Sequence, residues 1–327
     1  MNRIPSVLTL FFFIAFIFSA CTDIDPKKTV AEENNLLITI PDTSKIPNDE
    51  FGKMVGYGRS LLVNTAYLIG PEGINGRYTL NKMNCSNCHQ EAGTKPFSLN
   101  LVMSHTRYPQ YRAREAKVLT LAERINNCIE RPHNGRPLPY DSKEMIAILS
   151  YLKWINEQAA KGSLKGDQNL EITFPDRAAD PAAGKIVYES HCTRCHGSNG
   201  EGIIVKGQAS YTYPLLWGDN SYQPGSSMHR VIKMARWLKA NMPYDSARWD
   251  KPLLTDEQAL DVAAFVNDDR IHSRPSPKNF DFPNPIEKSI DYGRGPFADT
   301  FSEAQHKFGP YKPIIDYWKK KGWKPGY

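Results

Sequence analysis

CSNCH at residues 85–89 and CTRCH at residues 192–196 are the two stretches that decide the fold of this chain. Each is a CxxCH motif, in which two cysteines form thioether bonds to a c-type haem and the adjacent histidine becomes the fifth ligand of its iron. A single CxxCH can also arise by chance or belong to a zinc site, whereas two in one exported chain predict two covalently bound haems c. The expected attachment residues are Cys85, Cys88, Cys192 and Cys195, and the expected iron ligands are His89 and His196.

The first twenty residues have the features of a bacterial signal peptide. Arg3 supplies a minimal positive start, residues 7–18 are almost wholly apolar, and small residues precede Cys21. The apolar run is shorter than the roughly 20 residues of a transmembrane helix. FSAC at residues 18–21 resembles a lipobox, so Cys21 is predicted to be lipidated, with ordinary cleavage near Ala20 as the alternative. We therefore expect a periplasmic lipoprotein that is anchored to the membrane.

A coarse internal repeat organises the rest of the chain. In each half a helical segment with early glycines precedes the CxxCH motif, with Gly56 and Gly58 in the first half and Gly184 in the second. In each half a capped amphipathic helix closes the unit: DSKE at 141–144 leads into a helix over 145–155, and TDEQ at 255–258 leads into one over 259–266. A first and a last helix packed around a haem are typical of cytochrome c.

The predicted fold is therefore mainly α, with two cytochrome c-type domains in tandem, long loops and an irregular C-terminal tail. The expected segments are a lipid-anchored tether at 21–48, a first domain at 49–164, a linker at 165–180, a second domain at 181–272 and a tail at 273–327. The tail is rich in prolines and aromatic residues, so it should pack on the body. A net charge of +6 suits an anionic substrate or an acidic redox partner, and a solvated surface equally well. Nothing in the composition favours nucleic-acid binding.

Each haem iron needs a sixth ligand or an open site, and this choice separates an electron carrier from an enzyme. For the second haem we predict Met242, because a thioether raises the reduction potential and the following proline would hold a ligand loop extended. Met228 and Met234 are alternatives, but both fall where a helix is expected, over residues 227–239.

Two residues compete for the iron of the first haem. Met145 has a suitable spacing but falls in the first turn of a helix, where a core methionine is the simpler interpretation. Cys128 has no cysteine partner in an oxidising compartment, and it follows Leu121 and Ile125 at helical spacing. Arg124 lies one turn earlier, and a cation beside a sulfur favours the thiolate. A buried structural cysteine beside a solvated basic face is the alternative.

Several stretches resemble the dihaem thiosulfate dehydrogenases. They are MNCSNCH at 83–89 with AGT at 92–94, YPQYRAR at 108–114, RINNC at 124–128, NG at 134–135, LP at 138–139, PLLWG at 214–218, SY at 221–222, NMPY at 241–244 and FGPY at 308–311. The resemblance implies a catalytic first haem, a second haem through which electrons leave, and a substrate pocket with two arginines. The residues implied are His89 and Cys128 at the first iron, His196 and Met242 at the second, and Arg114 and Arg124 in the pocket.

The activity that the resemblance implies is the oxidation of two thiosulfate ions to tetrathionate, with the reverse reaction open to the same site. Cys128 would bond the sulfane sulfur of one thiosulfate, and a second thiosulfate would attack that adduct while the arginines offset the repulsion between dianions. Electrons would pass to a small periplasmic acceptor such as a cytochrome. Two alternatives are a non-catalytic dihaem electron carrier and a sulfur-oxidation cytochrome subunit that acts on a carrier-bound thiol.

Overall fold

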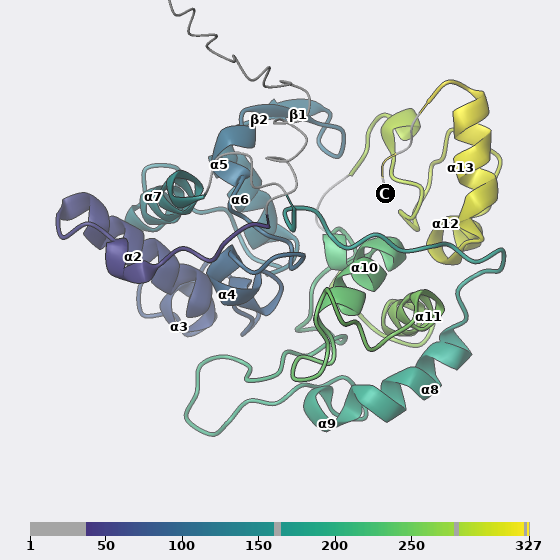
Figure 1. Ribbon diagram of the computed structural model, residues 1–327, viewed down its shortest axis with the longest axis horizontal. Helices are drawn as coiled ribbons and strands as arrows, with labels where there is room; N and C mark the ends of the chain where they lie inside the picture. The colour runs from purple at the N-terminus through teal and green to yellow at the C-terminus, as the bar shows by residue number, and fades with distance from the viewer. Residues whose placement is uncertain (1–36, 160–164, 278–280, 324–325, 327) are drawn as a thin grey trace, which may run out of the picture.

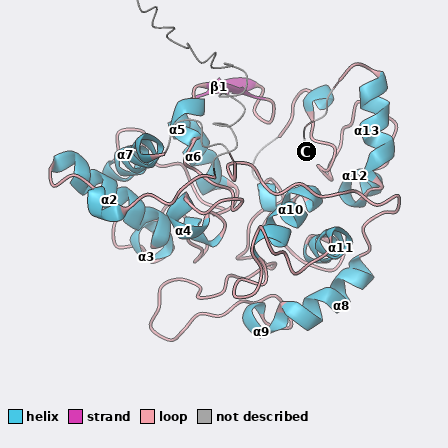
Figure 2. Ribbon diagram, in the orientation of Figure 1, coloured by secondary structure: helices cyan, strands magenta, loops and turns pink. Residues whose placement is uncertain are grey.

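The computed structural model describes residues 37–159, 165–277, 281–323 and 326. The predicted signal peptide, Cys21 and residues 21–36 of the predicted tether lie outside the described residues. The described secondary structure is mainly helical, with one small antiparallel sheet of two strands (Figure 2). No described helix combines the length and the apolar character that a membrane crossing requires.

The helices form two successive groups, followed by a C-terminal segment that lies beside the second group (Figure 1). The first group consists of α2 (Glu50–Val63), α3 (Thr65–Ile69), α4 (Gln90–Gly93), α5 (Ser104–Arg107), α6 (Leu121–Glu130) and α7 (Lys143–Gln158), with strands β1 (Gln110–Arg112) and β2 (Lys117–Leu119). The second consists of α8 (Pro181–His191), α9 (Thr193–His196), α10 (Val231–Asn241) and α11 (Asp256–Val266). The C-terminal segment contains α12 (Glu303–Phe308) and α13 (Tyr311–Lys320). Short 3-10 helices lie at Thr43–Lys45, Cys85–Asn87, Ser227–His229 and Pro285–Glu287.

The first and last helices of each group cross at a glycine. Where α2 packs on α7, a Cβ atom on Gly58 would lie 2.0 Å from the carbonyl oxygen of Ala147. Where α8 packs on α11, a Cβ atom on Gly184 would lie 1.9 Å from the carbonyl oxygen of Asp261. Both separations are far below van der Waals contact, so any larger residue would push the helices apart. The internal repeat that these glycines predicted is confirmed.

Side-chain caps set the start of the two closing helices. The Ser142 hydroxyl accepts a hydrogen bond from the Met145 N–H at 3.2 Å, so α7 begins at Lys143. At α11 the Thr255 hydroxyl accepts from the Gln258 N–H at 3.2 Å, and the Gln258 side chain accepts from the Thr255 N–H at 3.0 Å. These bonds satisfy backbone donors that have no partner within the helix. The two helices begin two and three residues before their predicted starts at Met145 and Ala259, because the capping stretches themselves form the first turn.

Two hydrophobic cores lie inside the two helical groups. The first is built mainly from α2 and α7, and the second from α8, α10 and α11. The second core also takes in Tyr311, Ile314 and Trp318 of α13. The C-terminal segment is thus packed on the body as predicted, but it is less irregular than predicted. A helix forms over Tyr311–Lys320 because its apolar residues recur at helical spacing and find an apolar surface to cover.

The segments on either side of the first domain are attached to the body. Ile38, which the sequence analysis placed in the tether, is 1% exposed in the first core, and its N–H donates to the carbonyl oxygen of Lys165 at 2.9 Å. Ile172 and Phe174, from the predicted linker, belong to the second core. Isolated apolar residues in otherwise polar stretches therefore join the cores, which the average polarity of those stretches did not indicate.

Candidate functional site

The histidine of the first CxxCH motif is oriented by a backbone carbonyl. His89 Nδ1 lies 2.5 Å from the carbonyl oxygen of Leu99, and because a carbonyl only accepts, Nδ1 carries the proton and Nε2 keeps its lone pair. Phe97 and Leu99 have φ angles of 57° and 49°, in the left-handed region, so a tight turn delivers this carbonyl. Burial lowers the pKa of His89 to about 4, and the ring is therefore neutral at pH 7. A neutral imidazole with a free Nε2 is suited to bind iron.

The second CxxCH motif repeats this arrangement with a different carbonyl. His196 Nδ1 lies 2.7 Å from the carbonyl oxygen of Pro214, so its Nε2 also keeps a lone pair. Burial lowers the pKa of His196 as well. Both predicted fifth ligands are thus held in the tautomer that ligation requires.

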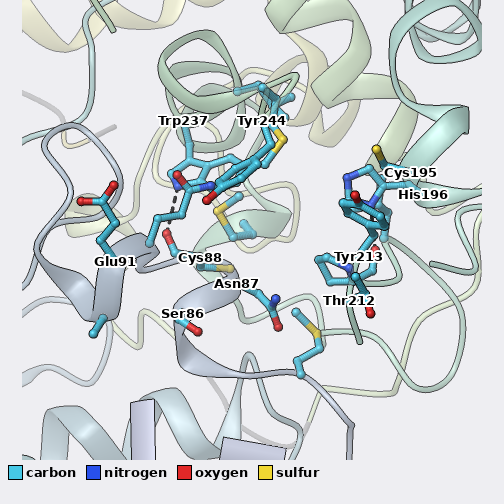
Figure 3. Close-up of a pocket in the computed structure, with 18 of the residues that line it drawn as sticks. Ser86, Asn87, Cys88, Glu91, Cys195, His196, Thr212, Tyr213, Trp237 and Tyr244 are labelled. Atoms are coloured by element: carbon cyan, nitrogen blue, oxygen red, sulfur yellow. Dashed lines mark hydrogen bonds between the residues drawn. The ribbon is translucent and has the colours of Figure 1, made fainter. Parts of the chain in front are cut away.

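An apolar cavity of about 790 Å³ runs from the second CxxCH motif to the first (Figure 3). Cys192, Cys195 and His196 line it on one side, and Cys88 lines it on the other. Its volume lies within the range of pockets that hold large organic ligands. Attachment cysteines, a neutral imidazole and thioethers around an apolar space are the donor set of a haem c, so the residues present fit that cofactor.

Four methionines line the cavity: Met83, just before the first CxxCH motif, and three from the second domain whose surroundings differ. Met234 Sδ accepts a hydrogen bond from Asn267 Nδ2 at 3.1 Å, and Met228 is buried in the second core. Met242 stands at the C-terminal end of α10 with an extended backbone (φ −129°, ψ 141°) and is followed by a proline, as the NMPY stretch predicted. It remains the predicted sixth ligand. Met145 is fully buried in the first core, as expected of a core methionine.

Cys128 lies on α6 in direct contact with a guanidinium group. Arg124 Nη1 donates to Cys128 Sγ at 3.3 Å, and the two residues are one helical turn apart. The Cys128 sulfur is the largest cause that raises the pKa of Arg124, against the opposing effect of burial. Cys128 is half-buried, and the five described cysteines form no disulfide. A cationic donor on the sulfur stabilises the thiolate, which is the nucleophilic and metal-binding form.

Cys128 and Arg124 belong to the same cluster as the first CxxCH motif. Burial raises the pKa of Cys85 to about 11, and the neighbouring Cys128 adds to that rise. Burial lowers the pKa of His89, and the Arg124 charge adds to that fall. The structure therefore brings together Cys85, His89, Arg124 and Cys128, four of the six residues that sequence analysis assigned to the first haem and its pocket.

Arg114 reaches this region from the turn between β1 and β2. Its Nη1 donates to the carbonyl oxygen of Gly225 at 2.6 Å, so it is tied to a loop of the second domain. Burial lowers the pKa of Arg114 to about 10, with Asp281 opposing the effect and neighbouring arginines, Arg124 among them, reinforcing it. Arg114 is a largely buried cation within electrostatic reach of Arg124, and its role in a substrate pocket stays a prediction.

Sequence analysis missed His133, which follows α6. It is 4% exposed, its Nε2 lies 3.5 Å from Cys85 Sγ, and its Nδ1 lies 3.2 Å from Asn81 Oδ1. Burial lowers its pKa to about 4, so this ring is neutral too. Since His133 lies outside any motif and meets a cysteine 48 residues earlier in the chain, no sequence pattern pointed to it.

Helix α10 links the two domains next to the cavity. Trp237 Nε1 donates to the carbonyl oxygen of Cys88 at 3.0 Å, as the dashed line in Figure 3 shows. Asn241 Nδ2 donates to the carbonyl oxygen of Phe97 at 2.9 Å. The helix that ends at Met242 is thus hydrogen-bonded to the first CxxCH motif and to the turn that orients His89.

Comparison with known proteins relates both halves of the chain to cytochromes. Residues 77–159 match the SoxA/TsdA cytochrome c domain, and residues 181–268 match the cytochrome c family, so the two predicted domains are confirmed. A thiosulfate dehydrogenase of Thiomonas intermedia is 36% identical over 232 residues, which are 70% of this chain and 69% of that protein. One from Stutzerimonas stutzeri is 34% identical over 255 residues (78% and 76%), and one from Allochromatium vinosum is 31% identical over 248 residues (75% and 87%).

A solved structure gives the same relationship. It is the thiosulfate dehydrogenase TsdBA from Marichromatium purpuratum in its as-isolated form. The TM-score is 0.67 at 30% sequence identity, and the match covers 80% of this chain and 54% of that one. This chain therefore spans about half the length of that protein.

Proposed function

The chain belongs to the thiosulfate dehydrogenase family, as a haem c-binding cytochrome that oxidises thiosulfate, and we propose that it joins two thiosulfate ions into one tetrathionate at Cys128. The observation that carries this proposal is the 3.3 Å contact between Arg124 Nη1 and Cys128 Sγ beside the first CxxCH motif. A cysteine with only a structural role in the core needs no cation on its sulfur, whereas a nucleophilic cysteine is activated by one.

Two covalently bound haems c fit this chain. The first would be held by Cys85, Cys88, His89 and Cys128, and the second by Cys192, Cys195, His196 and Met242. When bound, the haem irons supply the one-electron oxidation that sulfur chemistry alone lacks.

The proposed reaction has two steps that balance in atoms and charge. In the first, the Cys128 thiolate and the sulfane sulfur of one thiosulfate form an S–S bond as two electrons leave, which gives Cys128–S–S–SO₃⁻. In the second, the sulfane sulfur of another thiosulfate attacks the sulfur donated by the first. Tetrathionate forms, and Cys128 is released as a thiolate. The sum is two thiosulfate ions converted to one tetrathionate and two electrons, with no proton exchanged.

The arginines act on the charge of the substrates. Two dianions must approach one another and a thiolate, and their repulsion opposes every step. Arg124 holds the sulfur of Cys128 and offers further guanidinium N–H groups, and Arg114 adds a buried cation nearby. Fixed guanidinium groups in a site with little water offset this repulsion and align the reacting sulfurs.

We propose that electrons leave through the second domain to a small periplasmic acceptor such as a cytochrome. Helix α10 supports this route, because Trp237 bonds to Cys88 at one point and Met242 lines the second haem's cavity at the helix end. The predicted signal peptide and the lipobox-like stretch at Cys21 support our proposal of a periplasmic protein that is anchored to the membrane. With a lipid anchor, the protein should fractionate with membranes, and Cys21→Ser should release it.

The activity is tested with the purified holoprotein, thiosulfate and ferricyanide. We expect ferricyanide reduction that depends on thiosulfate, with one tetrathionate formed for every two ferricyanide ions reduced. A reduced dye with tetrathionate then measures the reverse reaction. A plain electron carrier would exchange electrons with dyes but form no tetrathionate, and that outcome would refute the proposal.

A further inference from the structure

Asp281, in the C-terminal segment, places a buried carboxylate among the arginines of the first domain. Its side chain is 1% exposed. Oδ1 accepts hydrogen bonds from Arg131 Nε at 3.2 Å and from Arg131 Nη2 at 2.6 Å, and Oδ2 accepts from the Tyr292 hydroxyl at 3.0 Å. Arg114 Nε lies 3.9 Å from Oδ2. A buried carboxylate that holds one guanidinium by two donors fixes that group in both position and orientation.

Arg131 is the C-cap residue of α6 and follows Cys128 by three residues with a helical backbone. Arg124 precedes Cys128 by four residues and Arg131 follows it by three, which are the spacings that bring side chains to one face of a helix. Arg124 donates to the sulfur, whereas Arg131 is held by Asp281 and by Glu115, whose Oε1 lies 3.2 Å from Nη2. Arg131 Nη1 is buried and has no hydrogen-bond partner among the described residues, which leaves one donor for a ligand.

Arg114 is held where three parts of the chain meet. Its Nη1 donates to Gly225 of the second domain, and its carbonyl oxygen accepts from the Phe282 N–H of the C-terminal segment at 2.8 Å. A Cβ atom on Gly225 would lie 3.1 Å from Asp281 Oδ2, so this loop lies directly against the carboxylate. Asp281 thus lies against both guanidinium groups and against the loop that accepts a hydrogen bond from Arg114.

We propose that Asp281 is a positioning residue of the sulfur centre, which fixes the Arg131 and Arg114 guanidinium groups beside Cys128. The inference rests on the proposed oxidation of thiosulfate at Cys128. Without the carboxylate, the cluster is more positive and attracts dianions at least as strongly, but its guanidinium groups are free to move. Small displacements of groups that align reacting atoms cost large factors in rate. Asp281 therefore acts on kcat rather than on substrate capture.

The test is Asp281→Asn in the full-length holoprotein, assayed with thiosulfate and ferricyanide. We expect kcat to fall by about tenfold or more while KM for thiosulfate stays level or decreases. Because one negative charge is lost, KM should also depend more steeply on ionic strength than in the wild type. An unchanged kcat, or a KM that rises in step with the fall in kcat, overturns the proposal.

Asp299→Asn is the matched control. Asp299 is also a buried carboxylate of the C-terminal segment, but its partners are His306 Nε2 at 2.9 Å and Trp318 Nε1 at 2.9 Å in the same segment. Removing its charge loosens that segment without touching the arginines. We expect a lower Tm with kcat and the salt dependence of KM unchanged. Equal losses of kcat in both variants would mean that Asp281 only holds the segment in place, and would overturn the proposal.

Two further variants keep the outcomes distinct. If Asp281→Asn fails to fold, Tyr292→Phe replaces it as the test, because it removes only the hydroxyl that bonds the same carboxylate. A lower kcat at an unchanged Tm supports the proposal, and an unchanged kcat overturns it. Cys128→Ser tests the proposed function itself, because it removes the sulfur to which thiosulfate is proposed to bond, and full turnover in this variant would contradict that function. A wild-type protein that forms no tetrathionate contradicts that function, whereas an active wild type with a fully active Asp281→Asn contradicts only the role of Asp281.

Discussion

The two cytochrome domains share the same arrangement of helices and differ in the residues near the haem-binding motif. In both, a first and a last helix cross at a glycine, and a backbone carbonyl fixes the tautomer of the CxxCH histidine. In the first domain, α6 brings Cys128 and a half-buried arginine to the motif. In the second, α10 brings apolar residues and ends at Met242. If the proposed function is right, one fold supports sulfur chemistry in the first domain and electron transfer in the second, and the two domains differ in the helix that carries the proposed sixth ligand.

Cys128→Ser should have the largest effect, because it removes the residue that distinguishes the first domain from the second. Serine keeps nearly the same volume, so we expect the fold and both haems to be retained, but its hydroxyl does not replace a thiolate as nucleophile or ligand. Thiosulfate turnover should fall by about a thousandfold or more. The spectrum of the first haem should change while that of the second does not. Full turnover in this variant would return Cys128 to a structural role.

Arg124→Ala should lower thiosulfate turnover by a smaller factor than Cys128→Ser. It removes the donor on Cys128 Sγ and one cation that faces the substrate, and the loss of one such donor costs on the order of a hundredfold in rate. Both haem spectra should stay nearly intact, because the substitution acts on charge rather than on iron. Arg124→Lys, which keeps the charge but loses the planar fork, should fall between wild type and Arg124→Ala. A full rescue by lysine would mean that charge alone matters.

Alanine substitutions at Gly58 and Gly184 should test whether the two helix crossings contribute equally to stability. Gly58→Ala and Gly184→Ala each place a Cβ atom against a carbonyl oxygen, so we expect each to destabilise the fold by about 1–3 kcal/mol in thermal unfolding. Gly56→Ala is the matched control, because a Cβ atom there has nothing within 4 Å and helix propensity favours alanine. If Gly58→Ala leaves stability unchanged while Gly184→Ala lowers it, the two helix crossings do not contribute equally to the stability of their domains.

Met242→Ala should affect only the second domain. Loss of a thioether that favours ferrous iron should lower the reduction potential of the second haem and slow the exit of electrons, while thiosulfate binding stays unchanged. Redox titration followed by visible spectra measures this directly. An unchanged potential would transfer the ligand role to Met228 or Met234, which line the same cavity.

Trp237→Phe should have the smallest effect. Phenylalanine keeps an aromatic ring but loses the hydrogen bond to the Cys88 carbonyl, so the two domains stay packed while one bonded link between them is cut. We expect a modest slowing of electron transfer between the domains, measured by rapid mixing with thiosulfate, at unchanged reduction potentials. If the rate does not change, electrons pass between the domains by another route.

Much of the candidate site could be predicted because its residues lie close together in the chain. The CxxCH motifs are contiguous, Arg124 and Cys128 are one helical turn apart, and the cap at Ser142 marks the start of a helix. His133 and Asp281 could not be predicted. Each acts through a partner far away in the sequence, and Asp281 meets Arg131 across 150 residues.

The sequence by itself determined the haem-binding motifs, the tandem order of the two domains, the family and the basic face around Cys128, because each depends on residues near in sequence or on a recognisable set of motifs. Only the tertiary structure decided that the C-terminal segment inserts a carboxylate among the arginines and that α10 bonds to the first CxxCH motif. These contacts arise when apolar residues such as Ile314 and Trp318 are buried in a shared core, which brings distant polar groups together. Buried polar groups must then find partners wherever the packing leaves them.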